Sequence, residues 1–450
     1  MPMPSRESTM VCAHVPSVRW FCAAIFAILT VSVAPCVVGA QEADPRPDKP
    51  DSVKFPNTIA GEFTPGTGFD IIKTTAGSLN ISVYGLARYV DQVPGNQTFV
   101  DHLGRVQTVD TRNDINWHRT MIWLSGFFFD PKFRYTITSW SLASTQQTLL
   151  FGLLQYRAAN WISFGVGIAP TLSARSMQGS WPYWAGSDRQ MAEEFFRGGF
   201  SSGFFVTGQV VPRLNYTLSI NNNLSQLGVS LPNDTRNMAY SGSLRWQPTT
   251  GEFGPRNGFG DLEYHRRLAT QFGTSMTSSR ESRYAPVDQP PNATQIKLSD
   301  GLNPFDFGAL ADGVTVTTLS YGEIAADAGL KYRGFAFQSE YYWRTLSDFV
   351  ATGPLPINSI FDQGFMSEAS YMVIPKTLGA HVVGSYISDA FKRYPYEIGG
   401  GLNFYPYGNR AWRLNLHVLH VKKSPASSSF GYYIGGQTGT IISLGTDVLF

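Results

Sequence analysis

The feature that most constrains this chain is a period of two in its hydrophobic pattern, repeated through segments of about ten residues. The segment IISLGTDVLF places Ile442, Leu444, Val448 and Phe450 on one face, and Ser443, Gly445 and Asp447 on the other. A strand shows this alternation when one side contacts an apolar phase and the other contacts water. The chain therefore favours strands, and the remaining question is which apolar phase they contact.

The same alternation recurs along the chain. In EIAADAGLKYRGFAFQSEYYWR the outer set is Ile324, Ala326, Ala328, Leu330, Tyr332, Phe335, Phe337, Tyr341 and Trp343, and the inner set is Glu323, Asp327, Lys331, Gln338, Glu340 and Arg344. About sixteen such strands are expected, at 78–90, 117–129, 132–142, 147–157, 160–170, 200–211, 213–222, 239–248, 258–272, 321–332, 334–345, 364–373, 377–388, 394–405, 411–422 and 438–450.

The connections between these segments fall into two groups. Tight turns are expected at 130–132, 158–160, 212, 333–334 and 375–377, and long loops at 91–116, 171–199, 223–238, 273–320, 346–363 and 423–437. Short turns at one end and long loops at the other are typical of an outer-membrane barrel. The expected fold is therefore all-β: a transmembrane antiparallel β-barrel with short periplasmic turns and long extracellular loops.

Closure follows from backbone hydrogen bonding, because an unpaired N–H or C=O in hydrocarbon costs several kcal/mol. The last strand is then expected to pair with the first. Phe450 is expected in the aromatic girdle at the periplasmic interface, with further girdle aromatics at 268–272 and 394–404. A core of a soluble β-sandwich is the alternative explanation of these aromatics. An aromatic at this position is also similar to the signal read by the barrel assembly machinery.

Composition bounds the class of protein and its partners. The chain has 450 residues, a formal net charge of +2, 14% aromatic residues and 15% charged residues. Soluble domains carry about 25% charged residues, and no basic run indicates a nucleic-acid partner. Cys12, Cys22 and Cys36 all precede residue 41, so a disulfide scaffold and a cysteine-based metal site are excluded from the rest of the chain.

The first forty residues predict export. Arg19 precedes a long apolar run that ends at Ala40, which is typical of a signal peptide over 1–40 with cleavage after Ala40. A retained membrane anchor and a lipoprotein signal ending at Cys36 are the alternatives. Residues 41–77 are rich in Pro, Asp and Gly and are expected to form a periplasmic linker, and 78–450 the barrel.

Two groups of residues are candidates for the solute path. Segment 171–199 mixes aromatic and charged residues and is expected to fold into the barrel as a constriction loop; its charged residues are Arg175, Asp188, Arg189, Glu193, Glu194 and Arg197. Packing of that loop on a neighbouring subunit is the alternative. Inward-facing cations expected to line the pore are Arg88, Arg134, Arg245, Arg267, Lys331, Arg344 and Arg413.

These cations slightly outnumber the inward-facing acids, which are Glu263, Glu323, Asp327, Glu340 and Glu397. Cationic side chains in a narrow pore favour anions, so a weak anion preference is expected, although many of them are expected to pair with carboxylates across strands. Arg266 conflicts with the pattern because it falls on the apolar face of segment 258–272. A lipid-facing Arg costs about 2–4 kcal/mol at the midplane, so a bulge, a membrane edge or a subunit contact is expected there.

The stretch GGGLNFYPYGNRAWRLNLHVLHV at 399–421 resembles the phosphate-selective porin O and P family. The residues that follow the family's rhythm are Gly401, Asn403, Phe404, Tyr405, Gly408, Arg413 and Leu414, whereas Pro406 and the length around Arg410 depart from it. The resemblance implies a trimeric, sixteen-stranded porin whose third long loop enters the lumen. It also implies basic residues at the constriction for phosphate-type anions, but no clean basic ladder is visible here.

The expected function is a water-filled channel for passive diffusion of small hydrophilic solutes, since a barrel of about sixteen strands leaves an aqueous interior. A structural or adhesion barrel is the alternative, with the Ser- and Pro-rich loop 273–320 as its exposed surface. Catalysis would have to use His265, His381 or His417, none of which has a Ser or Asp partner at a fixed offset. No cofactor and no metal motif are expected.

Overall fold

A computed structural model describes residues 65–142, 147–170, 181–224, 237–254, 258–283, 294–426 and 431–450. The expected signal peptide and the linker up to residue 64 lie outside these ranges. Within them the regular structure consists of strands and the short helix α2, Met191–Phe196. No helix among these residues is long and apolar enough to cross a membrane.

The strands fall into one large sheet and one small hairpin. The large sheet contains β1 Phe69–Lys73, β2 Gly77–Val93, β5 Asn113–Phe128, β6 Asp130–Leu142, β7 Gln147–Ala159, β8 Ile162–Pro170, β9 Phe200–Val211, β10 Leu214–Asn222, β11 Met238–Trp246, β12 Ala269–Ser282, β13 Val316–Tyr332, β14 Phe335–Ala351, β15 Ser359–Ile374, β16 Leu378–Ser388, β17 Tyr396–Phe404, β18 Trp412–Lys422 and β19 Gly439–Leu449. The hairpin is β3 Gln97–Val100 with β4 Val106–Val109, in the connection between β2 and β5.

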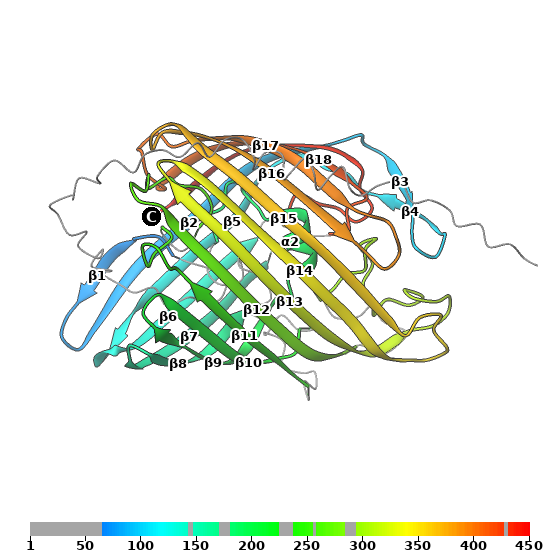
Figure 1. The fold of residues 1–450 in the computed structure, drawn as a ribbon, viewed down its shortest axis with the longest axis horizontal. Helices are drawn as coiled ribbons and strands as arrows, with labels where there is room; N and C mark the ends of the chain where they lie inside the picture. The colour runs from blue at the N-terminus through cyan, green and yellow to red at the C-terminus, as the bar shows by residue number, and fades with distance from the viewer. Residues whose placement is uncertain are drawn as a thin grey trace, which may run out of the picture. The chain divides into compact units, whose positions relative to one another are not determined.

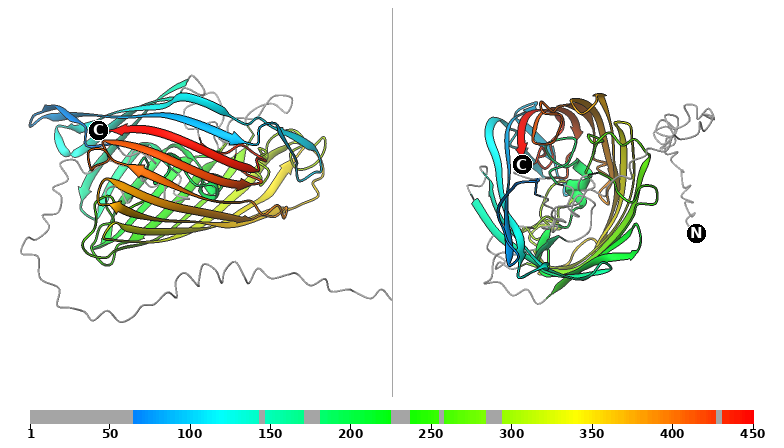
Figure 2. Two further views of the ribbon diagram at one scale, coloured as in Figure 1. Left: turned by 90° about the horizontal axis from the view of Figure 1, so that it is seen from above. Right: turned by 90° about the vertical axis from the view of Figure 1, so that its left-hand side faces the viewer.

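The large sheet closes on itself. Each strand from β5 to β18 pairs antiparallel with its neighbours in sequence, and β19 pairs with β2 from Thr440↔Val93 to Leu449↔Tyr84. The short strand β1 pairs with the start of β2, so the ring holds one strand fewer than the seventeen of the sheet, namely sixteen. Figures 1 and 2 show the ring from the side and end-on, with α2 inside it. The expected sixteen-stranded antiparallel barrel is confirmed.

One expected strand is wrong. Each expected span except 258–272 overlaps a barrel strand over most of its length, but the strand in that region is β12, Ala269–Ser282. Local bonds hold the preceding residues in a loop: the Asp261 carboxylate accepts the His265 N–H at 3.1 Å, and Tyr264 has a positive φ of 62°. Such side-chain to backbone bonds compete with strand formation.

This correction also changes the position of three charged residues. Arg267 and Glu263 do not face the lumen from a strand, because both lie in the connection before β12, where Arg267 is exposed. Arg266 lies in the same connection and is exposed, so it is not on the lipid face of a strand. The free-energy cost expected for an Arg in contact with lipid therefore does not apply to Arg266.

The two ends of the barrel differ as expected, with three corrections. Tight connections join β5–β6, β7–β8, β9–β10, β13–β14 and β15–β16 at one end, and long ones join β2–β5, β8–β9, β10–β11, β12–β13 and β18–β19 at the other. The β14–β15 connection is 352–358 rather than 346–363, and the β12–β13 connection is 283–315 rather than 273–320. The connection 247–268 between β11 and β12 is long although it lies at the tight-turn end.

Burial alternates along the strands as the hydrophobic pattern predicts. In β19, Leu444 is 55% and Phe450 37% exposed on the outer face, whereas Ser443 and Asp447 on the inner face are at most 1% exposed. Phe450 exchanges main-chain bonds with Val83 of β2 at 3.0 and 3.1 Å, and its ring contacts Phe69 at 5.3 Å. The apolar outer face is therefore continuous through the closing pair of strands.

The outer face gives a depth-dependent prediction. Leu416 points outward near the middle of β18, beside Leu402 and Leu444. Leu416→Arg is expected to lower the free energy of unfolding by about 2–4 kcal/mol, whereas Ile374→Arg, at the end of β15, costs about 0–1 kcal/mol. Guanidinium unfolding in phospholipid vesicles measures both changes. Equal effects of the two substitutions would contradict a membrane-spanning position for β18.

Candidate channel constriction

The inner face of the barrel carries apolar side chains as well as polar ones. On β2 and β5 the inward residues Tyr84, Leu86, Met121 and Trp123 are at most 1% exposed. They belong to a core cluster that also includes Trp181, Trp184, Met191, Phe195 and Phe196 from segment 181–199. Burial of these inward apolar residues is therefore achieved by a segment that folds inside the barrel.

The first anchor of segment 181–199 is an aromatic contact with the β2–β5 wall. The Trp181 ring meets Tyr84 edge-on at 4.7 Å and Trp123 at 6.3 Å, and it packs against Trp184 at 6.2 Å. The Arg119 guanidinium lies 5.6 Å from the Trp181 ring centre. Aromatic pairs at such distances contribute about 0.5–1.5 kcal/mol each beyond their buried area, so this end of the segment is firmly held.

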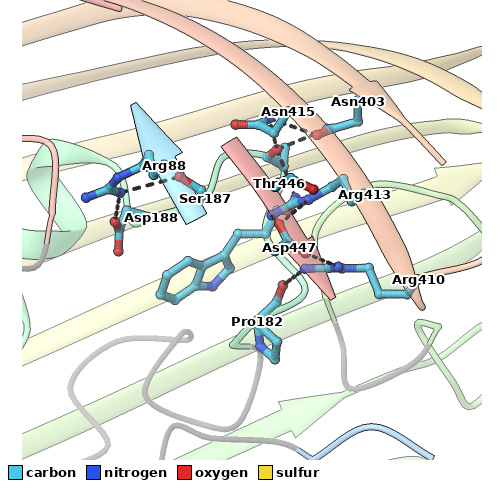
Figure 3. Close-up of polar contacts among 12 residues, drawn as sticks. Arg88, Pro182, Ser187, Asp188, Asn403, Arg410, Arg413, Asn415, Thr446 and Asp447 are labelled. Carbon is cyan, nitrogen blue, oxygen red and sulfur yellow. Dashed lines mark hydrogen bonds and ion pairs between the residues drawn. The ribbon is translucent and has the colours of Figure 1, made fainter. Parts of the chain in front are cut away.

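The second anchor satisfies the main-chain carbonyls of the segment (Figure 3). The Ala185 carbonyl accepts hydrogen bonds from Asn403 Nδ2 at 3.0 Å, Asn415 Nδ2 at 3.2 Å and Arg413 Nη1 at 3.2 Å. Arg413 is itself held by Asp447, with Nε and Nη2 at 2.9 and 2.7 Å from Oδ2. Buried carbonyls need such partners, and here the barrel wall supplies them.

The third anchor is the start of α2. The Met191 N–H donates to Glu397 Oε1 at 2.7 Å and the Ala192 N–H to Ser385 Oγ at 3.3 Å. The first N–H groups of a helix have no partner within the helix, so these two wall residues complete the helix end. The Tyr433 hydroxyl donates to the other Glu397 oxygen at 2.6 Å.

The fourth anchor lies on β14, next to β15. Phe196 stacks on Tyr342 at 5.0 Å, and the Arg344 guanidinium lies 3.9 Å from the ring centre of Phe195. Arg344 also donates to the Phe195 carbonyl at 3.0 Å and to Asp362 at 2.7 Å. Segment 181–199 is thus bonded to several sides of the barrel and crosses its interior.

Asp188 forms the electrostatic centre of the segment. Its carboxylate is paired with both Arg88 and Arg119, the latter at 2.8 Å. The two guanidinium groups also donate to His118 Nε2, at 3.2 and 3.0 Å. That nitrogen accepts both bonds, so the proton of the neutral ring lies on Nδ1. The Asp188 carboxylate thereby binds side chains of two neighbouring strands, β2 and β5.

The other charged residues expected in this loop are also brought inside the barrel. Arg189 lies 4.7 Å from the Trp184 ring centre and 3.5 Å from Glu193, and Arg197 is paired with Glu194 at 2.8 Å. All four side chains are at most 8% exposed. Arg175 lies outside the described residues.

The structure separates the cations expected to line the pore into three groups. Arg88, Lys331, Arg344 and Arg413 are inward but at most 2% exposed, so they contact protein groups rather than open water. Arg134 and Arg245 are half-buried near the tight-turn end of β6 and β11. The third group is Arg267, which lies in the connection before β12, as given above.

Two further segments, not expected from the sequence, pack inside the rim. In the β18–β19 connection, the Gly431 carbonyl accepts from Arg88 at 3.2 Å and the Tyr432 hydroxyl bonds the Ser187 N–H at 2.9 Å. In the β12–β13 connection, Ile296, Leu298, Phe305 and Leu310 are 1% exposed and form a second core cluster together with Leu319 and Leu346 of the strands. The expected exposed loop 273–320 is therefore wrong at both ends, where 273–282 belongs to β12 and 316–320 to β13, and most of residues 294–315 are buried or half-buried.

The connection 247–268 is fastened across the tight-turn end by charges. Asp261 accepts the Gly334 N–H at 2.7 Å from the β13–β14 turn and binds His265 Nδ1, while His265 Nε2 lies 3.1 Å from Glu252. Burial opposes the charge of His265, but the bonds to Asp261 and Glu252 outweigh it and raise the pKa of His265 to about 9. Burial also opposes the charge of Glu252, but its bonds to His265 and Gly254 lower its pKa to about 2.

This connection meets segment 181–199 in the barrel. The Phe259 N–H donates to the Tyr183 carbonyl at 2.7 Å. A cavity of about 30 Å³, room for roughly one water molecule, lies between Ala185 and residues 259–262. The Lys331 ammonium lies 4.7 Å from the Phe253 ring centre. The two inward segments therefore form one continuous layer.

Neither metal binding nor catalysis is supported by the histidines. Ligand atoms of Asp261, Glu263 and His265 lie within 4.8 Å of one another, but both ring nitrogens of His265 already face carboxylates, which is the arrangement of an imidazolium. His381 Nε2 and His417 Nδ1 lie 2.8 Å apart, and His381 Nδ1 lies 3.5 Å from Asn403 Nδ2. None of these contacts supplies the nucleophile and oriented base that a covalent mechanism needs.

Comparisons with known proteins bear on the fold. No family model matches the sequence, and no curated protein matches it. Among solved structures, the outer-membrane expressed OmpT of Vibrio cholerae has a TM-score of 0.53 at 11% identity, covering 84% of this chain and 100% of that one. The anion-selective porin from Comamonas acidovorans has a TM-score of 0.50 at 12% identity, covering 83% and 100%.

The chain has the fold of an outer-membrane β-barrel. Its closed ring of sixteen strands and its apolar outer face agree with the fold of both solved structures. The narrower resemblance to the phosphate-selective porins O and P stays a prediction.

Asp188 should contribute more to the free energy of unfolding of the barrel than a surface carboxylate does. Asp188→Asn leaves two buried guanidinium groups without their carboxylate, and breaking a buried pair costs about 3–5 kcal/mol. Asp312→Asn is the control, because Asp312 pairs with Arg105 at 3.5 Å but its side chain is 86% exposed, so about 0–1 kcal/mol is expected. Guanidinium unfolding in detergent measures both. An Asp188→Asn effect as small as the control would contradict the role of Asp188.

The stability of the contacts that hold connection 247–268 in place should depend on pH. The pKa of His265 is raised from 6.5 to about 9, so its contribution is complete below pH 6.5 and is lost as the pH rises through 9. Glu252 is lowered from 4.5 to about 2, so its contribution is complete above pH 4.5. Glu263 Oε2, Lys331 Nζ and the His265 ring all lie close to Gly254. The charges of Glu263 and Lys331 therefore also act on the His265 ring.

Hydrogen exchange of the His265 and Gly334 amides, corrected for the intrinsic rate, measures this dependence. Protection should be constant from pH 4.5 to 6.5 and should fall toward pH 10. His265→Gln is the matched variant, and its protection should show no such fall. A fall of equal size in the variant would show that His265 is not the group responsible.

Proposed function

We propose that this protein is a porin-type channel that lets small hydrophilic solutes diffuse across the outer membrane through a narrowed path. One observation carries the proposal: segment 181–199 crosses the inside of a closed sixteen-stranded barrel and is bonded to β2, β14, β17 and β18. A barrel of this size encloses more space than its own wall side chains fill. A bonded inward segment narrows that space without closing the ring.

The polar inner wall supports passage of hydrophilic solutes. On β9 to β12 the inward side chains are mostly hydroxyls, namely Ser201, Ser219, Ser241, Ser243, Ser275, Thr277 and Ser279. Hydroxyl groups both donate and accept hydrogen bonds, so this wall discriminates little between ions and neutral polar solutes. General diffusion is therefore the proposed mode.

A weak preference for anions is part of the proposal. Around segment 181–199 the guanidinium groups of Arg88, Arg119, Arg344, Arg410 and Arg413 face the carboxylates of Asp188, Asp362 and Asp447. With Arg189, Arg197, Glu193, Glu194 and Glu397 included, seven cations face six acids, so the excess is a single positive charge. Each of these cations is already paired, so the excess supports a weak field rather than a dedicated phosphate site.

A structural or adhesion barrel remains the second candidate, because the inward arginines that contact segment 181–199 are almost fully buried. Side-chain exposure is 0% for Arg88 and 1% for Arg344 and Arg413. A barrel packed this tightly could serve as an anchor that carries little current. The homotrimer, the barrel assembly machinery as a partner and the lack of enzymatic activity stay predictions.

Planar-bilayer recording separates the two candidates. Purified protein should give discrete current steps, with a reversal potential in a KCl gradient that indicates weak anion preference. Trp181→Ala combined with Phe196→Ala removes two anchors of segment 181–199, and the single-channel conductance should rise because the segment no longer holds its place.

Trp161→Ala is the control, because Trp161 lies on the outside and is 62% exposed; its conductance should equal that of the unchanged protein. Absence of current steps from folded protein would favour the structural barrel. Current steps that the double substitution leaves unchanged would instead show that segment 181–199 does not limit the flow.

A further inference from the structure

The outer surface where β16, β17 and β18 reach the end with the long connections is unusually basic and aromatic. It contains Tyr386, Lys392, Tyr394, Tyr396, His420, Lys422 and Lys423, which together are named the basic–aromatic corner. These side chains are exposed or half-exposed; Tyr386, Tyr396, His420 and Lys422 belong to the outer face of their strands, and Lys392, Tyr394 and Lys423 lie in the adjoining connections. The corner is independent of segment 181–199 and of the proposed channel.

Strand register places the aromatic residues of this corner side by side. Tyr386 is the partner of Tyr396, and Tyr396 is the partner of Lys422. The Tyr386 ring is parallel to that of Tyr394 at 6.4 Å, and Tyr396 lies 6.3 Å from His420. The Lys422 ammonium lies 5.6 Å from the Tyr396 ring centre. Amphipathic rings of this kind mark the level of the membrane–water interface.

The positive charge of the corner is not balanced by nearby acids. Among the described residues, Lys392, Lys422 and Lys423 form no ion pair. The nearest acids in sequence are committed elsewhere: Asp389 is 5% exposed and accepts N–H groups of residues 391, 393 and 394, and Glu397 points inward. An anion that binds here would therefore meet three ammonium groups without repulsion from an adjacent carboxylate.

The backbone holds three of these residues in an unfavourable conformation. Lys392, Tyr394 and Lys423 have positive φ angles of 56°, 54° and 52°. Seven other described non-Gly residues also have a positive φ, Lys376 at the opposite end among them. This conformation therefore belongs to the tight connections and does not by itself mark a binding site.

We propose that the basic–aromatic corner binds the phosphorylated headgroup of a glycolipid in the outer leaflet of the membrane. The end with the long connections is the extracellular end of an outer-membrane barrel, so the corner lies at the level of the outer-leaflet headgroups. The three lysines bind phosphate oxygens, and the tyrosine rings contact the sugar and the upper part of the acyl chains.

Binding of lipid A tests the proposal, with the full-length barrel in detergent and native mass spectrometry as the readout. Lys392→Gln, Lys422→Gln and Lys423→Gln together should weaken binding by about a hundredfold. The control Lys73→Gln, Lys132→Gln and Lys376→Gln removes the same charge from exposed lysines at the opposite end and should bind as the unchanged protein does. Dephosphorylated lipid A should bind weakly to all three proteins.

Equal binding by both triple variants, or equal binding of dephosphorylated lipid A, would overturn the proposal. So would displacement of lipid A by millimolar inorganic phosphate, because the corner would then be a site for free anions. A change in oligomeric state with lipid binding unaffected would identify the corner as a subunit contact instead. Far-UV circular dichroism verifies that each variant has kept its strand content.

Discussion

The structure depends on one constraint, which is that a backbone in hydrocarbon must satisfy its own hydrogen bonds. An unpaired N–H or C=O there costs several kcal/mol, so a sheet that crosses a membrane cannot have a free edge. The pairing of β19 with β2 removes the last edge, and it extends to the main chain of Phe450, which bonds to Val83. The strand count, the alternation of faces and the separation of short from long connections are all compatible with this closure.

Closure of the sheet encloses an interior, and segment 181–199 occupies part of that interior. Tyr84 and Trp123 face inward, and exposure of such large apolar side chains to water would forgo the stabilisation that burial provides. Segment 181–199 covers them, but its own main chain then needs partners away from water. Asn403, Asn415 and Arg413 supply these partners. The apolar and the polar residues of the inner wall therefore both bind segment 181–199.

The inward charges follow from the same packing. A guanidinium group inside the barrel needs a carboxylate or a carbonyl, because burial of an unpaired charge is costly. Arg344 meets Asp362, and Arg413 meets Asp447. Such pairs hold segments in position and leave little free charge for a passing ion. Counting inward arginines along the sequence therefore overstates the strength of any anion site.

The sequence by itself determined the strands, their two faces and the closed antiparallel barrel, because a period of two is local and its apolar face must meet lipid. Tyr84 and Trp123 break the polar face of their strands, but the alternation did not predict that segment 181–199 would cover them. Tertiary structure alone decided the position of β12, the fastening of 247–268 by Asp261 and His265, and the pairing of Arg88 with Asp188. Except for the local bond between Asp261 and His265, these features join residues far apart in the chain. Local periodicity carries no information about which distant partner a buried charge or carbonyl will find.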